Sequence, residues 1–208
     1  MIRHYFLMLL FLLSNIRISA QDFHPDLSGW DSDIIKTAGK KSKHLFQSKK
    51  QSETIFYCNL ARMNGALFVK TVLRPYCSFA GDTTYTPYLQ SLIGQLNSQK
   101  NAQPLKYGLW LSIMAKVHAV KSGIKGRTGH QNFERRLWLT MQFRKGAAEN
   151  CAYGLLHPLD IVIALLIDEG IPGVGHRKNI LDPKFKRIGV GFSRHKTFGT
   201  NCVQEFSF

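Results

Sequence analysis

Two histidines and two acidic residues fall within one stretch of the chain, and their side chains could do chemistry together. They are His130, Glu149, Asp168 and His176, and each histidine comes directly after a glycine. Glycine lets the backbone take unusual dihedral angles, so it can aim the next side chain into a cleft. Imidazole and carboxylate groups can bind a divalent metal or move protons. The four residues are therefore the candidate site.

Competing interpretations exist for part of this set. Asp168 has helical spacing with Ile161 and Leu165, so it either serves the site or faces water at the last turn of a helix. Glu169, its neighbour, could take its role. His118 lies beside an apolar helical stripe, and a histidine at the edge of the core is the simpler interpretation. The stretch has no His-x-x-x-His motif, and the chain has no Gly-x-Ser-x-Gly, which makes a serine nucleophile less credible.

The N-terminal residues indicate export. Arg3 precedes an apolar run over 5–13, and the small residues Ser19 and Ala20 follow, which is typical of a secretory signal peptide over 1–20. The apolar run is shorter than the roughly 20 residues that span a bilayer. No cysteine follows it, which argues against a lipoprotein. We therefore expect a secreted or periplasmic protein.

The chain is basic, with a formal net charge of +15, which falls by two to +13 once the two arginines of residues 1–20 are removed. Much of the excess lies in residues 21–51, which we interpret as a flexible basic linker. The charge favours contact with anionic lipid or a cell-wall polymer, including peripheral contact with a membrane. No nucleic-acid-binding motif accompanies it, so we expect no specific nucleic-acid partner.

Four cysteines, an even number, suggest two disulfides in an exported chain. Three connectivities are possible. Pairing of sequence neighbours favours Cys58–Cys77 and Cys151–Cys202. No Cys-x-x-Cys spacing supports a zinc site built from these thiols.

Helical and alternating patterns predict the elements around the candidate site. Apolar residues at helical spacing predict four helices: over 52–73 with Pro75 as the stop, from Pro87, over 104–122 with Gly123 as the cap, and over 159–169. Alternating residues predict an edge strand over 137–143 and two antiparallel strands over 185–193 and 201–208. In the third helix, one apolar stripe is predicted, formed by Leu109, Ile113, Val117 and Val120.

Three segments together resemble the CAP superfamily, the group of cysteine-rich secretory proteins, allergens and pathogenesis-related proteins. They are Glu-Asn-Cys-Ala-Tyr-Gly at 149–154, Gly-His-Arg-Lys-Asn-Ile-Leu at 175–181 and Ile-Gly-Val-Gly at 188–191. Their order and separation are fairly specific. The resemblance is closest to the bacterial type and covers about 52–208, which we take as a single domain.

The resemblance implies an α+β fold, a three-layer α-β-α sandwich with a central antiparallel sheet and a cleft. Family members place two histidines and two acids there, and some bind zinc or another divalent cation. By this resemblance the metal-site residues are His130, Glu149, Asp168 and His176, with His118, Asn150 and Glu169 in secondary cleft positions. Because the chain from His130 to Glu149 is longer than in many members, His118 could also occupy the first histidine position.

Three functions follow as hypotheses. The favoured one is a non-catalytic exported module that binds a ligand, lipid or cell-wall polymer. The alternative is a metal-dependent hydrolase, with Glu149 as general base and the histidines as ligands or proton carriers. The third is an adhesin whose binding depends on its positive charge and falls with salt.

Overall fold

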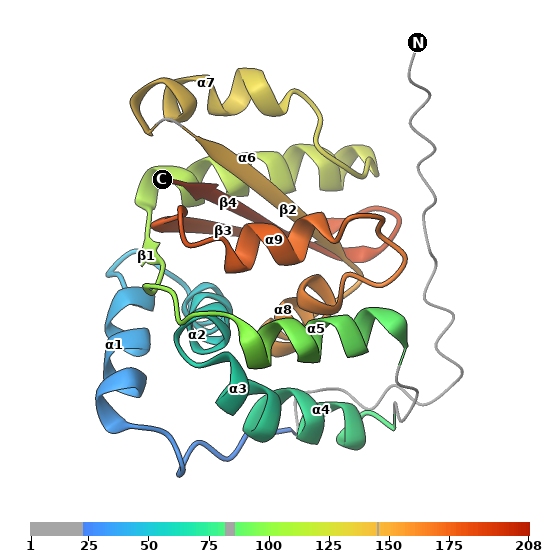
Figure 1. Cartoon of the computed structure of the whole chain (residues 1–208). Coiled ribbons are helices and arrows are strands. Elements are labelled where there is room, and N and C mark those ends of the chain that lie inside the picture. Colours follow the sequence, from blue (N-terminus) through green and yellow to red (C-terminus); the bar gives the residue numbers. More distant parts are fainter. Residues whose placement is uncertain (1–22, 82–85, 145) are drawn as a thin grey trace.

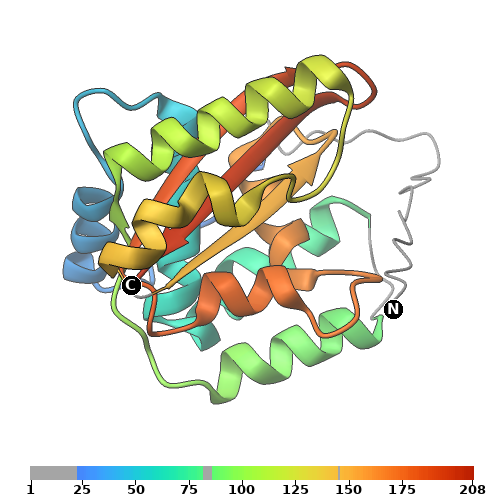
Figure 2. The same ribbon diagram turned by 90° about the horizontal axis from the view of Figure 1, so that it is seen from above.

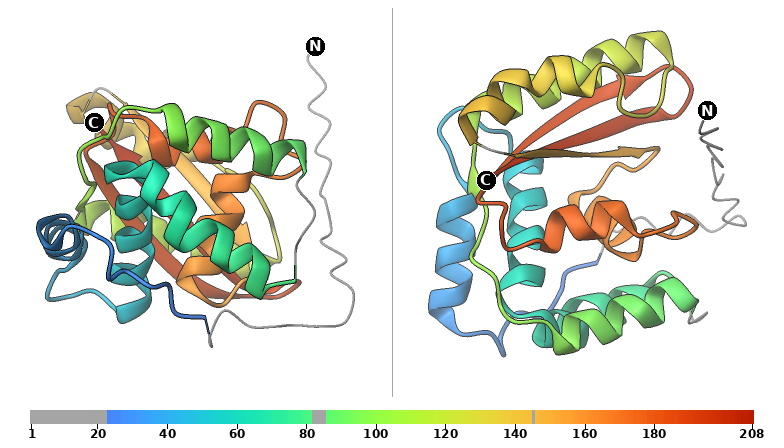
Figure 3. Two further views of the ribbon diagram at one scale, coloured as in Figure 1. Left: turned by 60° about the horizontal axis from the view of Figure 1, so that its bottom comes forward. Right: turned by 45° about the horizontal axis from the view of Figure 1, so that its top comes forward.

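The computed structural model describes residues 23–81, 86–144 and 146–208, which fold into three layers (Figure 1). Helices α6 (Leu109–Lys125) and α7 (Phe133–Arg144) cover one face of a four-stranded sheet, and most other helices lie against the opposite side (Figures 1 and 3). This is the predicted α+β sandwich. The remaining helical elements are α1 (Ser32–Ser42), α2 (Lys49–Met63), α3 (Gly65–Phe68), the π-helical turn η2 (Val69–Leu73), α4 (Arg74–Phe79), α5 (Pro87–Ser98), α8 (Pro158–Ile167) and α9 (Gly175–Leu181). The predicted signal peptide lies outside the described residues.

The sheet has the strand order β1-β3-β4-β2. β3 (Arg187–His195) and β4 (Gly199–Ser207) form the predicted antiparallel hairpin, and β2 (Ala147–Tyr153) pairs antiparallel with β4. The two-residue strand β1 (Lys106–Tyr107) pairs with β3 in parallel, so the sheet is antiparallel except at this edge. Within the part of the chain that the structure describes, no helix is both long and apolar enough to cross a membrane.

Helix α6 lies directly on the backbone of the sheet. A Cβ atom at Gly189 would lie 2.1 Å from the carbonyl carbon of Leu111, and one at Gly191 would lie 2.3 Å from the backbone nitrogen of Lys116. Side chains at these strand positions would push the helix away, so the glycines permit the close approach. The helix face turned to the sheet is correspondingly rich in small buried residues, Ser112, Ala115, Ala119 and Ser122.

The apolar stripe predicted for this helix faces the other way. Leu109, Ile113 and Val117 are exposed, because the surface against the sheet is taken by residues small enough for backbone contact. Gly123 was also predicted wrongly as the cap. It lies inside the helix, where a Cβ atom would meet the carbonyl oxygen of Arg194, and the helix ends at Gly126 with a left-handed φ of 63°.

The main hydrophobic core lies on the opposite face of the sheet. Ile55 and Leu60 of α2, Ile161 of α8 and Val190 of β3 are buried in it. Buried Arg177 of α9 donates hydrogen bonds to the carbonyl oxygens at the end of α8, at 2.6 and 2.7 Å. α9, which carries one candidate histidine, is thereby attached to the core helix that precedes it.

The helices predicted from Pro87 and over 159–169 are confirmed as α5 and α8. The helix predicted over 52–73 is interrupted, because Asn64 ends α2 and its side chain caps α3. Pro75 does not stop the helical segment. It lies in the first turn of α4, where its missing N–H leaves few hydrogen bonds unmade.

The prediction of a flexible linker over 21–51 needs correction. Residues 32–42 form α1, capped by the side chain of Asp31. Trp30 and Ala38 are buried, and the Trp30 indole donates to Thr71 Oγ1 at 2.9 Å. These few apolar anchors secure a segment whose average composition is that of a solvated chain.

The edge strand predicted over 137–143 is also wrong, because these residues belong to α7. A short alternating run cannot by itself exclude a helix. The segment contains strong helix formers, and Glu134 lies in the first turn, where a negative charge suits the helix dipole.

Neither predicted disulfide, Cys58–Cys77 or Cys151–Cys202, is present in the part of the chain that the structure describes. Cys151 pairs in register with Val203, whereas Cys202 pairs with Ala152. Because successive strand residues point to opposite faces, the two thiols lie on opposite sides of the sheet. Cys151 packs with Ala115 and Ala119 of α6, and Cys202 belongs to the main core.

Candidate functional site

Two buried acids face each other across the β2–β4 pair. Glu149 of β2 stands directly opposite Glu205 of β4, and both side chains are almost fully buried. Arg136 of α7 bridges them: its Nη1 lies 2.7 Å from Glu149 Oε2 and 2.7 Å from Glu205 Oε1, and its Nη2 donates to Glu149 Oε1 at 3.0 Å. The guanidinium group of Arg136 therefore contacts both carboxyl groups.

The shared cation makes the two acids unequal. Burial and the charge of Glu149 raise the pKa of Glu205, which therefore keeps its proton at neutral pH. Burial also opposes ionisation of Glu149, but hydrogen bonds from His130, Arg136 and Glu205 outweigh it and lower the pKa of Glu149. Glu149 is thus the anion of the pair, and Glu205 is a neutral acid.

His130 extends this network to the surface. Its Nδ1 lies 2.8 Å from Glu149 Oε1, and its side chain is 42% exposed. The loop that carries it is held by Gly129, whose N–H donates to the Tyr153 hydroxyl at 2.8 Å. Gly129 has a φ of 92°, a value that favours glycine and turns His130 toward the sheet.

Asp168 and His176 form a second pair of the same kind. Asp168 Oδ1 lies 2.7 Å from His176 Nδ1, and its Oδ2 accepts the His176 backbone N–H at 2.9 Å. Asp168 follows the last residue of α8 and has a left-handed φ of 57°, which is uncommon for a residue other than glycine. Val174, just before α9, is left-handed as well. Strained backbone of this sort is often found at functional sites.

The two pairs meet at their histidines. The ring centroids of His130 and His176 are 6.4 Å apart, and the His176 side chain is 21% exposed, while both partner acids are buried. With each Nδ1 on a carboxylate, the tautomer that donates from Nδ1 leaves Nε2 with a free lone pair. Histidine metal ligands are commonly oriented in this way, by a carboxylate on the nitrogen that does not bind the metal. The donor set therefore fits a divalent cation held by two Nε2 atoms.

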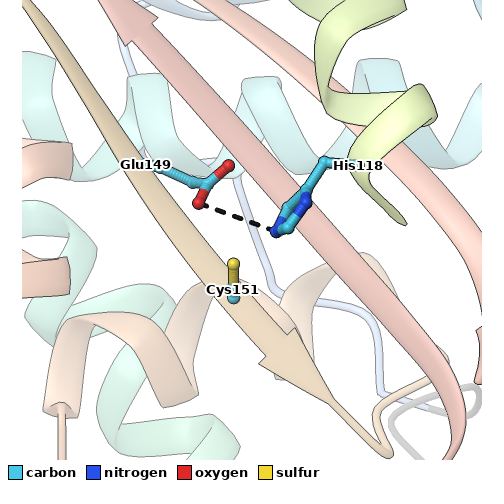
Figure 4. Close-up of side chains that lie close together, drawn as sticks. All are labelled: His118, Glu149 and Cys151. Carbon is cyan, nitrogen blue, oxygen red and sulfur yellow. Dashed lines mark ion pairs between the residues drawn. The ribbon is translucent and has the colours of Figure 1, made fainter. Parts of the chain in front are cut away.

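A third group of possible ligands lies deeper, on the side of the sheet covered by α6 (Figure 4). His118, Glu149 and Cys151 have ligand atoms within 4.8 Å of one another, and all three are buried. His118 Nε2 lies 3.0 Å from the carbonyl oxygen of Gly129 and 3.8 Å from Glu149 Oε1. A donor hydrogen bond to that carbonyl occupies the nitrogen that a metal would need.

The other groups in this cluster are equally unsuited to a metal. Burial, together with the charge of Glu149, raises the pKa of Cys151 well above its ordinary value, so the thiol keeps its proton. Burial lowers the pKa of His118, which favours a neutral imidazole, but its Nε2 is already occupied by the carbonyl oxygen of Gly129. Arg136 already neutralises Glu149, and a further buried cation would be repelled. We interpret this cluster as support for Glu149 rather than as a metal site.

Two of the residues predicted for secondary cleft positions, Asn150 and Glu169, do not contact the ring of either histidine in the described part of the chain. Asn150 donates to the carbonyl oxygen of His176 at 3.2 Å and accepts from Asn179 at 2.8 Å, so it joins β2 to α9. Glu169 accepts a hydrogen bond from Thr86 at 2.6 Å and does not contact His176 in the described contacts. Of the two neighbouring acids, Asp168 is therefore the one that contacts His176.

Sequence reasoning missed Arg136 and Glu205. Arg136 lies in α7, one residue before the segment 137–143 that was predicted as a strand, and no pattern separated it from the other arginines nearby. An available signal was Glu205 itself, an acid inside an apolar alternating segment, since such residues are seldom buried unless paired.

The chain was compared with known proteins. The family model described as "Cysteine-rich secretory protein family" (CAP) matches residues 15–206. A search of curated proteins found no match. Among solved structures, the chain is similar to an outer surface protein from Borrelia burgdorferi, with 19% identity and a TM-score of 0.44, covering 60% of this chain and 94% of that one.

Two further solved structures cover 58% of this chain. One is a cysteine-rich secretory protein from Staphylococcus aureus, with 17% identity and a TM-score of 0.41, and the other is an extracellular SCP-domain protein from Bacillus anthracis, with 20% identity and a TM-score of 0.40. The match spans only 38% and 40% of those two chains. The family match, by contrast, extends over nearly all of the present sequence, and the chain belongs to the CAP family.

Proposed function

We propose that this protein is an exported, non-catalytic CAP module whose cleft binds a divalent cation, with zinc as the first candidate. The observation that carries the proposal is the pair of partly exposed histidines, each with its Nδ1 on a buried carboxylate and their rings 6.4 Å apart. His130 and His176 would be the ligands. Glu149 and Asp168 would orient the two rings and raise the basicity of the metal-binding nitrogens.

The environment of Glu149 argues against catalysis. A general base needs a carboxylate that is free to take a proton from water and has a pKa near the working pH. Both Glu149 oxygens contact Arg136, one also contacts His130, and its pKa is lowered. A metal-dependent hydrolase remains the alternative, and chelator-sensitive turnover in a peptide and ester screen would support it over the proposal.

The module's natural ligand is proposed to be a lipid or an anionic cell-wall polymer outside the cytoplasm. The support is the charge of the chain, +15 before any processing. Binding of isolated wall polymer or lipid should weaken steeply as salt rises. Binding that is insensitive to salt would count against a charge-driven ligand.

Zinc titration by calorimetry tests the cation site. The chelator-treated wild type should bind one equivalent of zinc, and the variant H130A/H176A should bind none, because it lacks both proposed ligands. The matched control is H24A, which removes an exposed histidine outside the cleft. Thermal melting of each variant checks the fold. Unchanged zinc binding by a folded H130A/H176A protein would remove the cation from the proposal.

A further inference from the structure

The outer face of α6 is an apolar surface that no described element covers. Five large apolar side chains are exposed on this helix: Leu109, Trp110, Ile113, Val117 and Ile124. Trp110 is 54% exposed and Ile124 is 73% exposed. At 100° per residue these positions occupy one side of the helix, opposite the small residues that contact the sheet. Exposed apolar residues that gather on one side of a helix indicate an interaction site more strongly than singly scattered ones do.

The edges of this apolar face are basic. Lys116 borders it on one side, and Lys121 and Lys125 border it on the other, all three exposed. The helix contains no acidic residue. Beyond its C-terminal end, Arg127 and Lys196 are exposed as well, and the N–H of Lys196 donates to Gly123 of the helix at 2.9 Å. The positive charge therefore extends around the end of the apolar face.

A neighbouring helix adds to the same layer. α7 lies beside α6 on the outer side of the sheet (Figure 2). Its Trp138 is 58% exposed, although the preceding residue, Leu137, is fully buried. Tryptophan is enriched where a protein meets the boundary between lipid headgroups and acyl chains, because the ring is both apolar and able to donate a hydrogen bond. Two exposed tryptophans on one layer suit such a boundary.

We propose that the outer face of α6 docks on an anionic lipid bilayer. Trp110, Ile113 and Val117 would enter the headgroup region, and the flanking lysines would contact lipid phosphates. An interfacial helix of this kind combines an apolar side with basic flanks. Charge favours this occupant over a second copy of the chain, because two copies would bring like-charged lysines together. The inference rests on the proposed function in two respects, that the protein is exported and that its ligand is a lipid, and it does not involve the two histidines of the cation site.

Vesicle flotation tests the proposal. The wild type should float with vesicles of phosphatidylcholine and phosphatidylglycerol, and it should not float with phosphatidylcholine alone. The variant I113E/V117E should bind at least about tenfold more weakly, because it removes apolar contact and adds charge that anionic lipid repels. K121Q/K125Q should weaken binding and reduce its dependence on salt. The matched control L45E, at an exposed leucine outside α6, should bind like the wild type.

Fluorescence and oligomeric state separate the outcomes. Anionic vesicles should shift the tryptophan emission of the wild type to shorter wavelength, and W110F should show a smaller shift. Melting curves and zinc titration of the α6 variants verify that the fold and the cleft are intact. Equal flotation of the wild type and I113E/V117E would overturn the proposal. A wild-type dimer that ignores vesicles and becomes monomeric in I113E/V117E would overturn it in favour of self-association.

Discussion

Replacement of Arg136 by methionine should destabilise the protein far more than an ordinary surface change. Arg136 is the cation between Glu149 and Glu205, with contacts of 2.7 Å to each, and the side chain of Glu149 is 1% exposed. Methionine fills much of the same space and leaves the Glu149 charge buried with His130 as its remaining close partner. Removal of one member of a buried ion pair costs about 3–5 kcal/mol. We expect about 3 kcal/mol at pH 7, because protonation of Glu149 limits the loss.

Urea unfolding followed by circular dichroism measures this change. R135M is the matched control, since the neighbouring arginine is exposed and its loss should cost less than about 0.5 kcal/mol. Without Arg136, burial raises the pKa of Glu149, and a group with a raised folded-state pKa regains stability as pH falls. The defect of R136M should therefore shrink toward pH 4. Addition of E149Q to R136M should restore part of the loss. The reasoning fails if R136M behaves like R135M, or if the two substitutions are simply additive.

Three further substitutions test other parts of the structure. E205Q should be as stable as the wild type near pH 4 and more stable than it by up to about 3 kcal/mol at pH 7. The folded wild type must keep a proton on Glu205, whereas the unfolded chain releases this proton above the ordinary pKa of about 4.3. Urea unfolding at the two pH values measures the difference, and parallel pH profiles of the two proteins would contradict the prediction. G191A should lower the free energy of unfolding by about 1–3 kcal/mol, because its Cβ atom meets the backbone of α6. G94A should not lower it, because a Cβ atom at Gly94 meets nothing within 4 Å. Thermal melting compares the two variants, and equal effects would contradict the contact at Gly191. D168N should weaken zinc binding about 10–100-fold, because it removes the carboxylate that orients His176. Calorimetry measures the affinity, and the melting temperature should be unchanged. Undiminished affinity would contradict the role of Asp168.

Local patterns predicted some element boundaries at proline and glycine correctly, although Pro75 and Gly123 were assigned wrongly. α8 begins at Pro158, and the β3–β4 hairpin turns at Gly199, where φ is 75°. Proline and glycine restrict or permit particular backbone angles, which can be interpreted without a structure. A glycine that is needed for close packing, such as Gly123, cannot be recognised in this way.

Orientation and partner choice could not be predicted in the same way. The apolar stripe of α6 suggested the buried side, but close contact with Gly189 and Gly191 selected the small residues instead. The opposition of Glu149 and Glu205 depends on the register of two strands far apart in the sequence. Neither composition nor periodicity reports a register, since the pairing partner is chosen by the whole sheet.

The two halves of the candidate site therefore differ in how they are built. Asp168 and His176 are eight residues apart, and their contact needs only the end of α8 and the start of α9. The half formed by His130 and Glu149 also needs Arg136 from α7 and Glu205 from β4. A change at Arg136 should thus disturb one histidine and leave the other in place. Zinc should then bind R136M more weakly, because the ring of His130 is no longer held in its orientation while the ring of His176 still is.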